Sequence, residues 1–193
     1  MTHYLYLHGF QSGPQSLKAR ETRDFLAASG AEHSFQAPQL SPYPATAIAQ
    51  AAALIADQQQ ALVLIGSSLG GFYASHLAER FHLPAVLINP AIYPERDLAR
   101  FLGPQHNPYT GEDYVLTEQH MAELEAIRPP QIHAANYWLL LGTADEVLDW
   151  RVAARHYTGA RQTVFNGDDH RLQRWPQCLP ALLQLQGRLP ASY

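Results

Sequence analysis

One short segment constrains the fold of this chain more than any other. Residues 61–65 are Ala-Leu-Val-Leu-Ile, without a polar side chain, and they lead directly into a glycine-rich turn. Strands of parallel sheets are buried on both faces and have such continuous apolar runs. The turn is followed by residues 69–81, whose apolar spacing predicts a helix. The segment therefore predicts a strand–turn–helix unit within a parallel sheet.

The same alternation continues along the chain. Further strands are predicted at residues 4–7, 33–37, 85–88, 137–141 and 162–165. Further helices are predicted at residues 14–29, 44–60 and 149–157, and a closing helix carries Trp175, Cys178, Leu182, Leu185 and Leu189 at helical spacing. Strands separated by helices imply right-handed crossovers. We therefore expect a mostly parallel, six-stranded sheet with helices on both faces.

The composition limits the class of protein. The chain has 193 residues, which suits one domain with a stable core, and a net charge of −4. Its 13 basic residues are scattered among 17 acidic ones, so no basic surface for nucleic acid is predicted. No apolar run approaches the roughly 20 residues of a membrane span. Residues 1–7 do not resemble a signal peptide, and Cys178 is the only cysteine. We expect a cytoplasmic protein without nucleic-acid partners, and the sequence leaves its oligomeric state open.

The glycine-rich turn has the form G-x-S-x-G between Gly66 and Gly70. In so tight a strand-to-helix turn, the residues two before and two after a nucleophilic serine must lack bulk. Ser68 meets this condition, whereas Ser67 would be flanked by an isoleucine and a leucine. The alternative is a turn that binds a phosphate or only packs. The pattern favours Ser68 as a catalytic nucleophile.

A serine hydroxyl needs a base to take its proton, and the base needs an acid that orients it. With this kind of turn, the acid and then the histidine follow the serine along the chain. His133 precedes the strand that is expected to deliver the acid, and His156 lies within a helix pattern. His170 lies in the loop after the last predicted strand, so it is the predicted base.

The orienting acid is predicted in the loop after the preceding strand, where Asp145 comes first and Glu146 is the second choice. Three further carboxylates are less suitable. Asp168 and Asp169 adjoin the histidine and would have to fold back to reach its ring, and Asp149 is placed to cap the next helix.

An acyl-transfer site also needs fixed donors for the developing oxyanion. One donor is predicted to be the backbone N–H of Leu69, which follows the nucleophile. The second is predicted in the loop after the first strand, at the N–H of Phe10. The alternative for His8-Gly9 in that loop is a simple strand end.

Six motifs occur together in the chain: Tyr-Leu-His-Gly-Phe at 6–10, Gly-Ser-Ser-Leu-Gly-Gly at 66–71, Asn-Pro at 89–90, Asn-Pro-Tyr-Thr-Gly at 107–111, Asp-Glu-Val-Leu-Asp at 145–149, and the late His170. With them the chain resembles the YqiA-like esterases, small bacterial members of the α/β-hydrolase superfamily. The resemblance implies hydrolysis of acyl esters or acyl thioesters without a cofactor. It also implies Ser68 as nucleophile, Asp145 as orienting acid and His170 as base.

The fold expected from both lines of reasoning is a compact α/β hydrolase with strand order 2-1-3-4-5-6, counted along the chain. The regular pattern is lost at residues 90–130, where at most two short helices are predicted, at 95–102 and 117–127. We expect this segment to be a small cap, inserted after the fourth strand of a single domain that spans residues 1–193. Its aromatic residues either line an acyl pocket or pack the cap onto the body; they are Tyr93, Phe101, Tyr109 and Tyr114.

The sequence thus predicts a serine hydrolase that cleaves small-molecule acyl esters or thioesters through an acyl-enzyme intermediate. It predicts no cofactor and no metal site. Two alternatives stay open: an amidase or peptidase with the same triad, and a non-catalytic binding module on the same scaffold.

Overall fold

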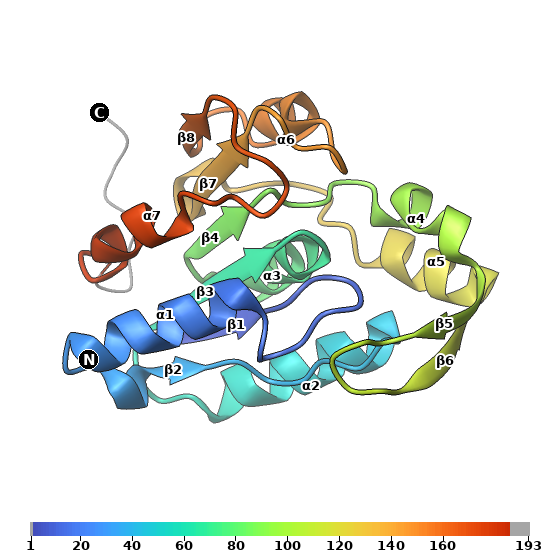
Figure 1. The fold of residues 1–193 in the computed structure, drawn as a ribbon, viewed down its shortest axis with the longest axis horizontal. Coiled ribbons are helices and arrows are strands. Elements are labelled where there is room, and N and C mark those ends of the chain that lie inside the picture. Colours follow the sequence, from blue (N-terminus) through green and yellow to red (C-terminus); the bar gives the residue numbers. More distant parts are fainter. Residues whose placement is uncertain (1, 186–193) are drawn as a thin grey trace.

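A six-stranded parallel sheet forms the centre of the computed structural model, which describes residues 2–185 (Figure 1). Its strands are β1 (His3–Leu7), β2 (Phe35–Gln36), β3 (Leu62–Ser67), β4 (Ala85–Ile88), β7 (Tyr137–Gly142) and β8 (Arg161–Phe165). Every neighbouring pair is parallel, in the order β2-β1-β3-β4-β7-β8. Counted along the chain, these six strands have the predicted order 2-1-3-4-5-6, which is confirmed.

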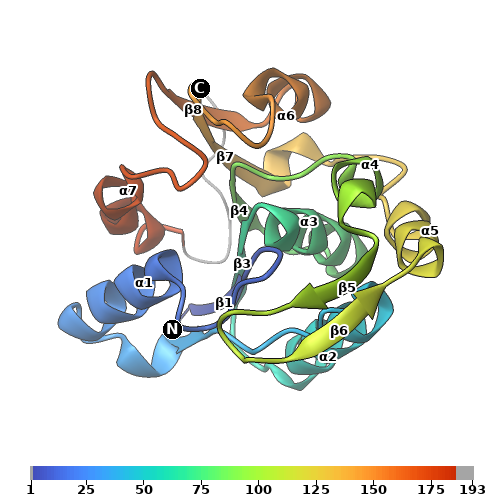
Figure 2. The same ribbon diagram turned by 45° about the vertical axis from the view of Figure 1, so that its right-hand side comes forward.

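Helices cover both faces of the sheet. One face carries α1 (Leu17–Ala28) and α7 (Trp175–Leu182), and the other carries α2 (Pro44–Asp57), α3 (Leu69–Phe81) and α6 (Trp150–His156). Figure 2 shows the sheet between these two layers. Strand residues alternate between the layers, so that Val63 and Ile65 pack towards α1 and α7 while Leu62 and Leu64 pack towards α2 and α3. Both layers exclude water from β3, which explains its continuous apolar sequence.

Most predicted boundaries agree with the structure, and α3 and β4 agree to the residue. The helix predicted at residues 14–29 begins later, at Leu17, because the chain makes a turn in which the Ser16 N–H donates to the Gly13 carbonyl at 3.0 Å. The strand predicted at 33–37 is reduced to β2, since a 3₁₀ turn occupies Glu32–Ser34. In the closing helix, Leu185 is buried beyond the end of α7, and Leu189 lies outside the described residues.

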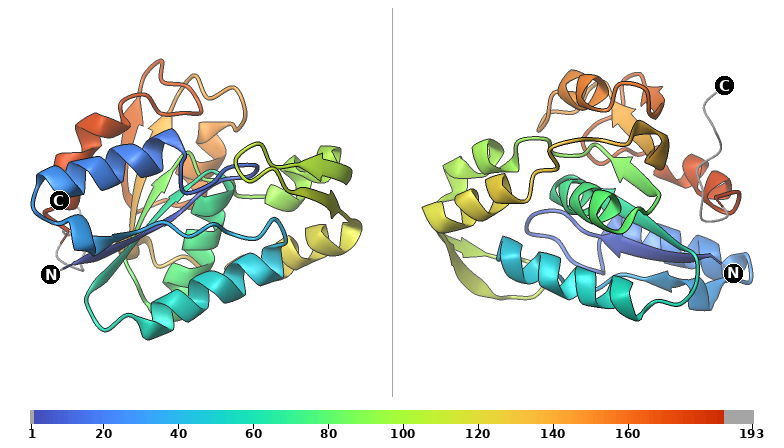
Figure 3. Two further views of the ribbon diagram at one scale, coloured as in Figure 1. Left: turned by 60° about the horizontal axis from the view of Figure 1, so that its bottom comes forward. Right: turned by 180° about the vertical axis from the view of Figure 1, so that it is seen from behind.

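Residues 90–130 contain more regular structure than the sequence predicts. They form α4 (Pro94–Asp97), a 3₁₀ turn (Ala99–Phe101), an antiparallel hairpin of β5 (Gly103–His106) and β6 (Asp113–Leu116), and α5 (Glu118–Ala126). The helix predicted at 95–102 is therefore shorter, and the hairpin was not predicted. Both views of Figure 3 show the hairpin and α5 at the end of the molecule away from the N-terminus.

The hairpin has a local cause. The Asn107 carbonyl accepts from the Gly111 N–H at 2.8 Å, and its side-chain oxygen accepts from the Tyr109 N–H at 2.8 Å. These bonds close the turn, while Tyr114 and Leu116 of β6 are buried in alternation with exposed neighbours.

Across residues 2–185, no helix combines the length and the apolar character needed to cross a membrane.

Candidate active site

The turn between β3 and α3 holds Ser68 in a strained backbone conformation. Its φ is 55° and its ψ is −121°, a region that residues with a Cβ seldom adopt. The glycines around it have no room for a side chain. A Cβ at Gly70 would lie 2.0 Å from the Leu7 carbonyl oxygen, and one at Gly66 would lie 2.3 Å from the Gly70 oxygen. The turn is thus the sharp strand-to-helix turn that the sequence predicts.

Asp145 and His170 are brought together at the carboxyl ends of β7 and β8. The Nδ1 of His170 lies 2.8 Å from one carboxylate oxygen of Asp145 and 3.0 Å from the other. The Asp145 side chain is 1% exposed and also accepts hydrogen bonds from the N–H groups of Val147 and Leu148, both at 2.8 Å. Three donors therefore fix this buried carboxylate in one orientation towards the imidazole.

The other candidate acids contact backbone amides instead. Glu146 accepts from the His170 N–H at 3.0 Å, and Asp149 accepts from the Arg151 N–H at 3.0 Å as the N-cap of α6, as predicted. Asp168 and Asp169 accept from the N–H groups of Arg174 and Arg171. Among the described residues, Asp145 alone reaches the His170 ring.

The other two candidate histidines lie elsewhere. His133 pairs with Glu79 of α3, and the ring of His156 on α6 packs against Tyr157 with centroids 4.9 Å apart. Neither is brought to the loop of Asp145 or to the turn of Ser68.

The N–H groups of Phe10 and Leu69 belong to residues that line the same cavity as Ser68 and His170. Within residues 2–185, neither N–H donates to a protein acceptor. Both amides are therefore available to a bound oxygen atom. Phe10 and Leu69 are the same two residues that the sequence singles out as candidate oxyanion donors.

The His8 side chain supports the loop that carries Phe10. Sequence reasoning did not predict this role. Its Nδ1 donates to the Gly9 carbonyl at 2.9 Å, and its Nε2 accepts from the Leu40 N–H at 3.0 Å. An acceptor nitrogen must be unprotonated, so this ring is neutral. Burial lowers the pKa of His8, which favours the same neutral form. The indication of this role in the sequence is that His8 directly follows the first predicted strand.

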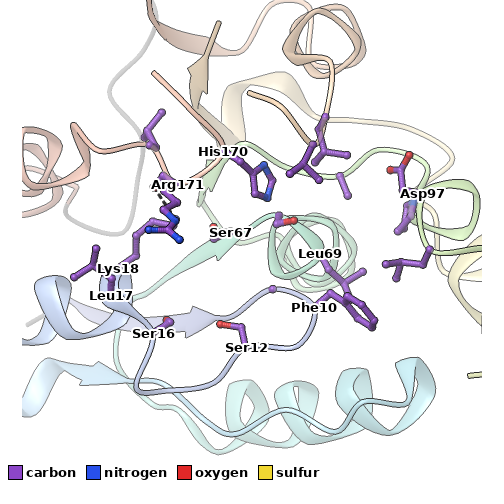
Figure 4. A pocket seen from close by; sticks show the side chains of 18 of the residues that line it. Phe10, Ser12, Ser16, Leu17, Lys18, Ser67, Leu69, Asp97, His170 and Arg171 are labelled. Atoms are coloured by element: carbon purple, nitrogen blue, oxygen red, sulfur yellow. Dashed lines mark hydrogen bonds between the residues drawn. The ribbon is translucent and has the colours of Figure 1, made fainter. Parts of the chain in front are cut away.

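A cavity of about 900 Å³ connects these residues. Figure 4 shows Lys18 and Arg171 on one side of it, Asp97 on the other, and His170 between them. We name the first side the polar end, which is lined by Ser16, Lys18 and Arg171, with Leu17 beside Lys18. We name the second side the apolar end, where Figure 4 labels Phe10, Leu69 and Asp97. Pro94 of α4, Leu98 and Phe101 line the cavity next to these residues, as does Arg100.

The segment 90–130 supplies part of the apolar end. Phe101 lines the cavity with its ring centroid 5.2 Å from that of Phe10. Tyr109 also lines the cavity, but it lies against Gly13, where a Cβ would be 3.2 Å from the Tyr109 Cβ. Tyr93 instead contacts the guanidinium groups of Arg96 and Arg128, at 4.6 and 4.9 Å from its ring centroid, and Tyr114 is buried against Tyr43. Of the four aromatic residues considered from the sequence, two line the cavity and two pack the segment.

Burial shifts the pKa values of three ionisable groups around the cavity. The pKa of Lys18 is lowered to about 8 because its ammonium group is removed from water, and its Nζ donates to the Arg171 carbonyl at 2.7 Å. Burial raises the pKa of Asp97 at the opposite end, and that of Glu21, which follows Lys18 by one turn of α1. No sequence pattern marked Lys18, although it is the only lysine in the chain.

Among residues 2–185, no group of three or more His, Cys, Asp or Glu side chains is placed to hold a metal ion. Cys178 is buried against α1 and the sheet, and burial raises the pKa of its thiol to about 11. It is a core residue, as expected from its spacing.

Several solved structures are similar to this chain over nearly its whole length. A hydrolase candidate from Agrobacterium vitis has a TM-score of 0.73 at 20% identity, covering 97% of this chain and 88% of that one. Mouse alpha/beta hydrolase domain-containing protein 10 has a TM-score of 0.67 at 18% identity, covering 94% and 88%. A monoacylglycerol lipase from Paleococcus ferrophilus has a TM-score of 0.63 at 14% identity, covering 94% and 92%. The predicted α/β-hydrolase fold is confirmed.

The sequence itself also matches a family model. The model of the uncharacterised protein family UPF0227 covers residues 3–187, which is nearly the entire chain. Because this match and the fold agree with the motifs quoted above, the chain belongs to the UPF0227 family, the YqiA-like α/β hydrolases.

Proposed function

We propose that the protein is a serine hydrolase that cleaves carboxylic esters or thioesters of small molecules. Ser68 is the nucleophile, His170 the general base and Asp145 the acid that orients it. The observation that carries this proposal is the hydrogen bond from His170 to the buried Asp145 carboxylate, because His170 lines the same cavity as the strained Ser68. The N–H groups of Phe10 and Leu69, which have no acceptor within residues 2–185, support it.

In the first half of the reaction, the Ser68 hydroxyl oxygen attacks the substrate carbonyl carbon and His170 Nε2 accepts the hydroxyl proton. Asp145 stabilises the imidazolium through Nδ1. The carbonyl oxygen becomes an oxyanion, which the N–H groups of Phe10 and Leu69 bind. When the tetrahedral intermediate collapses, the carbon–oxygen or carbon–sulfur bond breaks and His170 protonates the leaving alcohol or thiol.

In the second half, water attacks the acyl-enzyme. His170 takes one proton from the water and later returns it to the Ser68 oxygen, releasing the carboxylic acid. In residues 2–185 the Ser68 hydroxyl and the His170 ring share the cavity without a direct hydrogen bond. Catalytic hydrogen bonds often shorten only when substrate is bound, so this geometry is compatible with the proposed roles.

The two ends of the cavity suggest how a substrate lies. The leaving group must receive the proton of His170, and Arg171 directly follows that residue at the polar end. The acyl group then occupies the apolar end, beneath α4 and Phe101. We propose accordingly that residues 90–130 act as the cap of a single hydrolase domain. The similarity to a monoacylglycerol lipase, whose name denotes an ester as substrate, supports this class.

The proposal is tested with p-nitrophenyl esters, matching thioesters and a fluorophosphonate probe. We expect the probe to label the wild-type protein, and Ser68→Ala to lose labelling and at least about 10⁴-fold in kcat. Turnover near the wild-type rate in Ser68→Ala would refute the assignment. If Ser67→Ala lost the label and Ser68→Ala kept it, the nucleophile would be Ser67.

The same assay separates the two alternatives. An ester and an anilide with one common acyl group distinguish an esterase from an amidase, since we expect faster cleavage of the ester. A protein that neither turns over any substrate nor reacts with the probe would be a binding module.

A further inference from the structure

Asn89 uses every hydrogen-bonding group of its side-chain amide. It directly follows β4 and is 3% exposed. Its Oδ1 accepts from the Gly142 N–H at 2.8 Å, and its Nδ2 donates to the carbonyl oxygens of Asp169 and His170, both at 3.1 Å. An amide has one acceptor and two N–H donors, so all three are satisfied by backbone groups of two other segments.

These two segments carry the proposed acid and base. Gly142 ends β7 and begins the loop that leads to Asp145, while Asp169 and His170 belong to the loop after β8. One buried side chain therefore bonds to both loops at once. The bond to the His170 carbonyl acts on the same residue whose ring must face both Asp145 and Ser68.

The backbone around Asn89 also contacts the nucleophile turn. The Ile88 carbonyl accepts from the Ser68 N–H at 3.0 Å, and the Ala91 N–H donates to the Ser68 carbonyl at 3.1 Å. Residues 88–91 thus hold the segments of all three proposed catalytic residues. A shift at this point changes the distances between them.

We propose that Asn89 is a positioning residue, which sets the His170 loop relative to Asp145 and Ser68; this inference rests on the proposed function. It touches neither substrate nor the reacting atoms. It acts through the backbone of His170, and its loss alters the rate of the chemical step more than the binding of substrate.

Asparagine fits this position in two ways. Its φ is 40°, a left-handed conformation that asparagine and aspartate tolerate better than most residues with a Cβ. Aspartate has the same shape, but it would direct an acceptor oxygen at the carbonyl oxygens of Asp169 and His170. Glycine would keep the backbone conformation and remove the whole side chain.

Other bonds keep the two loops assembled without Asn89. The Ala144 N–H donates to the Asp168 carbonyl at 2.9 Å, and the His170 N–H donates to Glu146 at 3.0 Å. The loops therefore stay joined when Asn89 is replaced, and the expected defect is one of orientation. An error of about 1 Å in a catalytic group can lower the rate about 100-fold.

The test compares Asn89→Asp and Asn89→Gly with a matched control, Tyr157→Phe. The control removes another buried hydrogen bond, from the Tyr157 hydroxyl to the Ser75 hydroxyl at 2.8 Å, on the face covered by α3 and α6. We expect both Asn89 variants to lose about 100-fold in kcat with KM within about twofold of wild type. The rate of fluorophosphonate labelling should fall by the same factor, whereas Tyr157→Phe keeps its kcat.

A second readout does not depend on turnover. The Nδ1 proton of His170, bonded to Asp145, gives a far-downfield resonance in the proton NMR spectrum. We expect it to shift or broaden in the Asn89 variants and to stay in place in Tyr157→Phe. If Asn89→Asp does not fold, the same measurements on Asn89→Gly provide the test.

Three results would overturn the positioning role: wild-type kcat in a folded Asn89 variant, a higher KM with unchanged kcat, or an unchanged His170 resonance. If instead the wild-type protein lacks both turnover and labelling, the proposed function fails, and the resonance still decides whether Asn89 orients His170.

Discussion

The Nδ1 of His170 contacts both carboxylate oxygens of Asp145, at 2.8 and 3.0 Å. The adjacent carboxylate, Glu146, binds only the backbone N–H of the histidine. We therefore expect Asp145→Asn to lower kcat by up to about 10⁴-fold, because an amide N–H facing the ring selects the wrong tautomer. Glu146→Gln should cost about tenfold or less. Hydrolysis of a p-nitrophenyl ester by the purified variants measures both, and a larger loss in Glu146→Gln would transfer the role to that residue.

The strain at Ser68 predicts a difference between two inactive variants. With φ at 55° and ψ at −121°, any residue with a Cβ is strained, whereas glycine is not. We expect Ser68→Gly to be more stable than Ser68→Ala by about 1 kcal/mol, after the entropy of the glycine in the unfolded chain is deducted. Urea unfolding gives the two free energies, and equal values would show that the strain at Ser68 is no larger than the entropic cost of the glycine.

The single lysine offers a pH-dependent signal. Burial lowers the pKa of Lys18 from 10.5 to about 8 in the folded protein, so between these two pH values the unfolded chain binds more protons. The stability of the wild type should therefore rise relative to Lys18→Met as the pH increases from about 8 towards 10, and the difference should be constant below 7. Unfolding curves across this range test the sign. A parallel pH dependence in both proteins would place the pKa of Lys18 in its ordinary range.

Asp97 gives the opposite dependence. Its pKa is raised from 3.8 by burial at the apolar end, so the folded protein binds more protons than the unfolded chain just above pH 3.8. The contribution of Asp97 to stability falls as the pH rises through that window. We expect Asp97→Asn to be more stable than wild type at pH 7 and to lose this advantage below pH 3.8. Thermal unfolding at both pH values checks it, and an advantage that is equal at both would contradict it.

The sheet could be predicted because its signal is local and continuous. The apolar runs of β3, β4 and β7 are long enough to identify buried strands, and the glycines around Ser68 leave one arrangement for the turn. The order of the strands came from the resemblance and the crossover rule together. The proposed acid and base were predicted from their position after strands, and the structure brings them together.

The contacts that hold the site together could not be predicted. Asn89 forms hydrogen bonds with groups that lie 53 and 81 residues further along the chain, and only the fold shows that they are neighbours. Lys18 reaches across 153 residues to Arg171. The hairpin of β5 and β6 was missed because each strand has four residues, and one contains a proline. Such short strands resemble irregular chain.

The position of residues 90–130 between two neighbouring parallel strands limits how this protein can be shortened. The chain leaves β4 at the carboxyl ends of the strands, near Ser68. It must enter β7 at their amino ends, because the two strands are parallel. A parallel pair needs a crossover of about a dozen residues or more. The segment is therefore a required connection as well as a wall of the cavity. A shortened protein would have to retain a crossover such as α5, whose Met121 and Leu124 are part of the core.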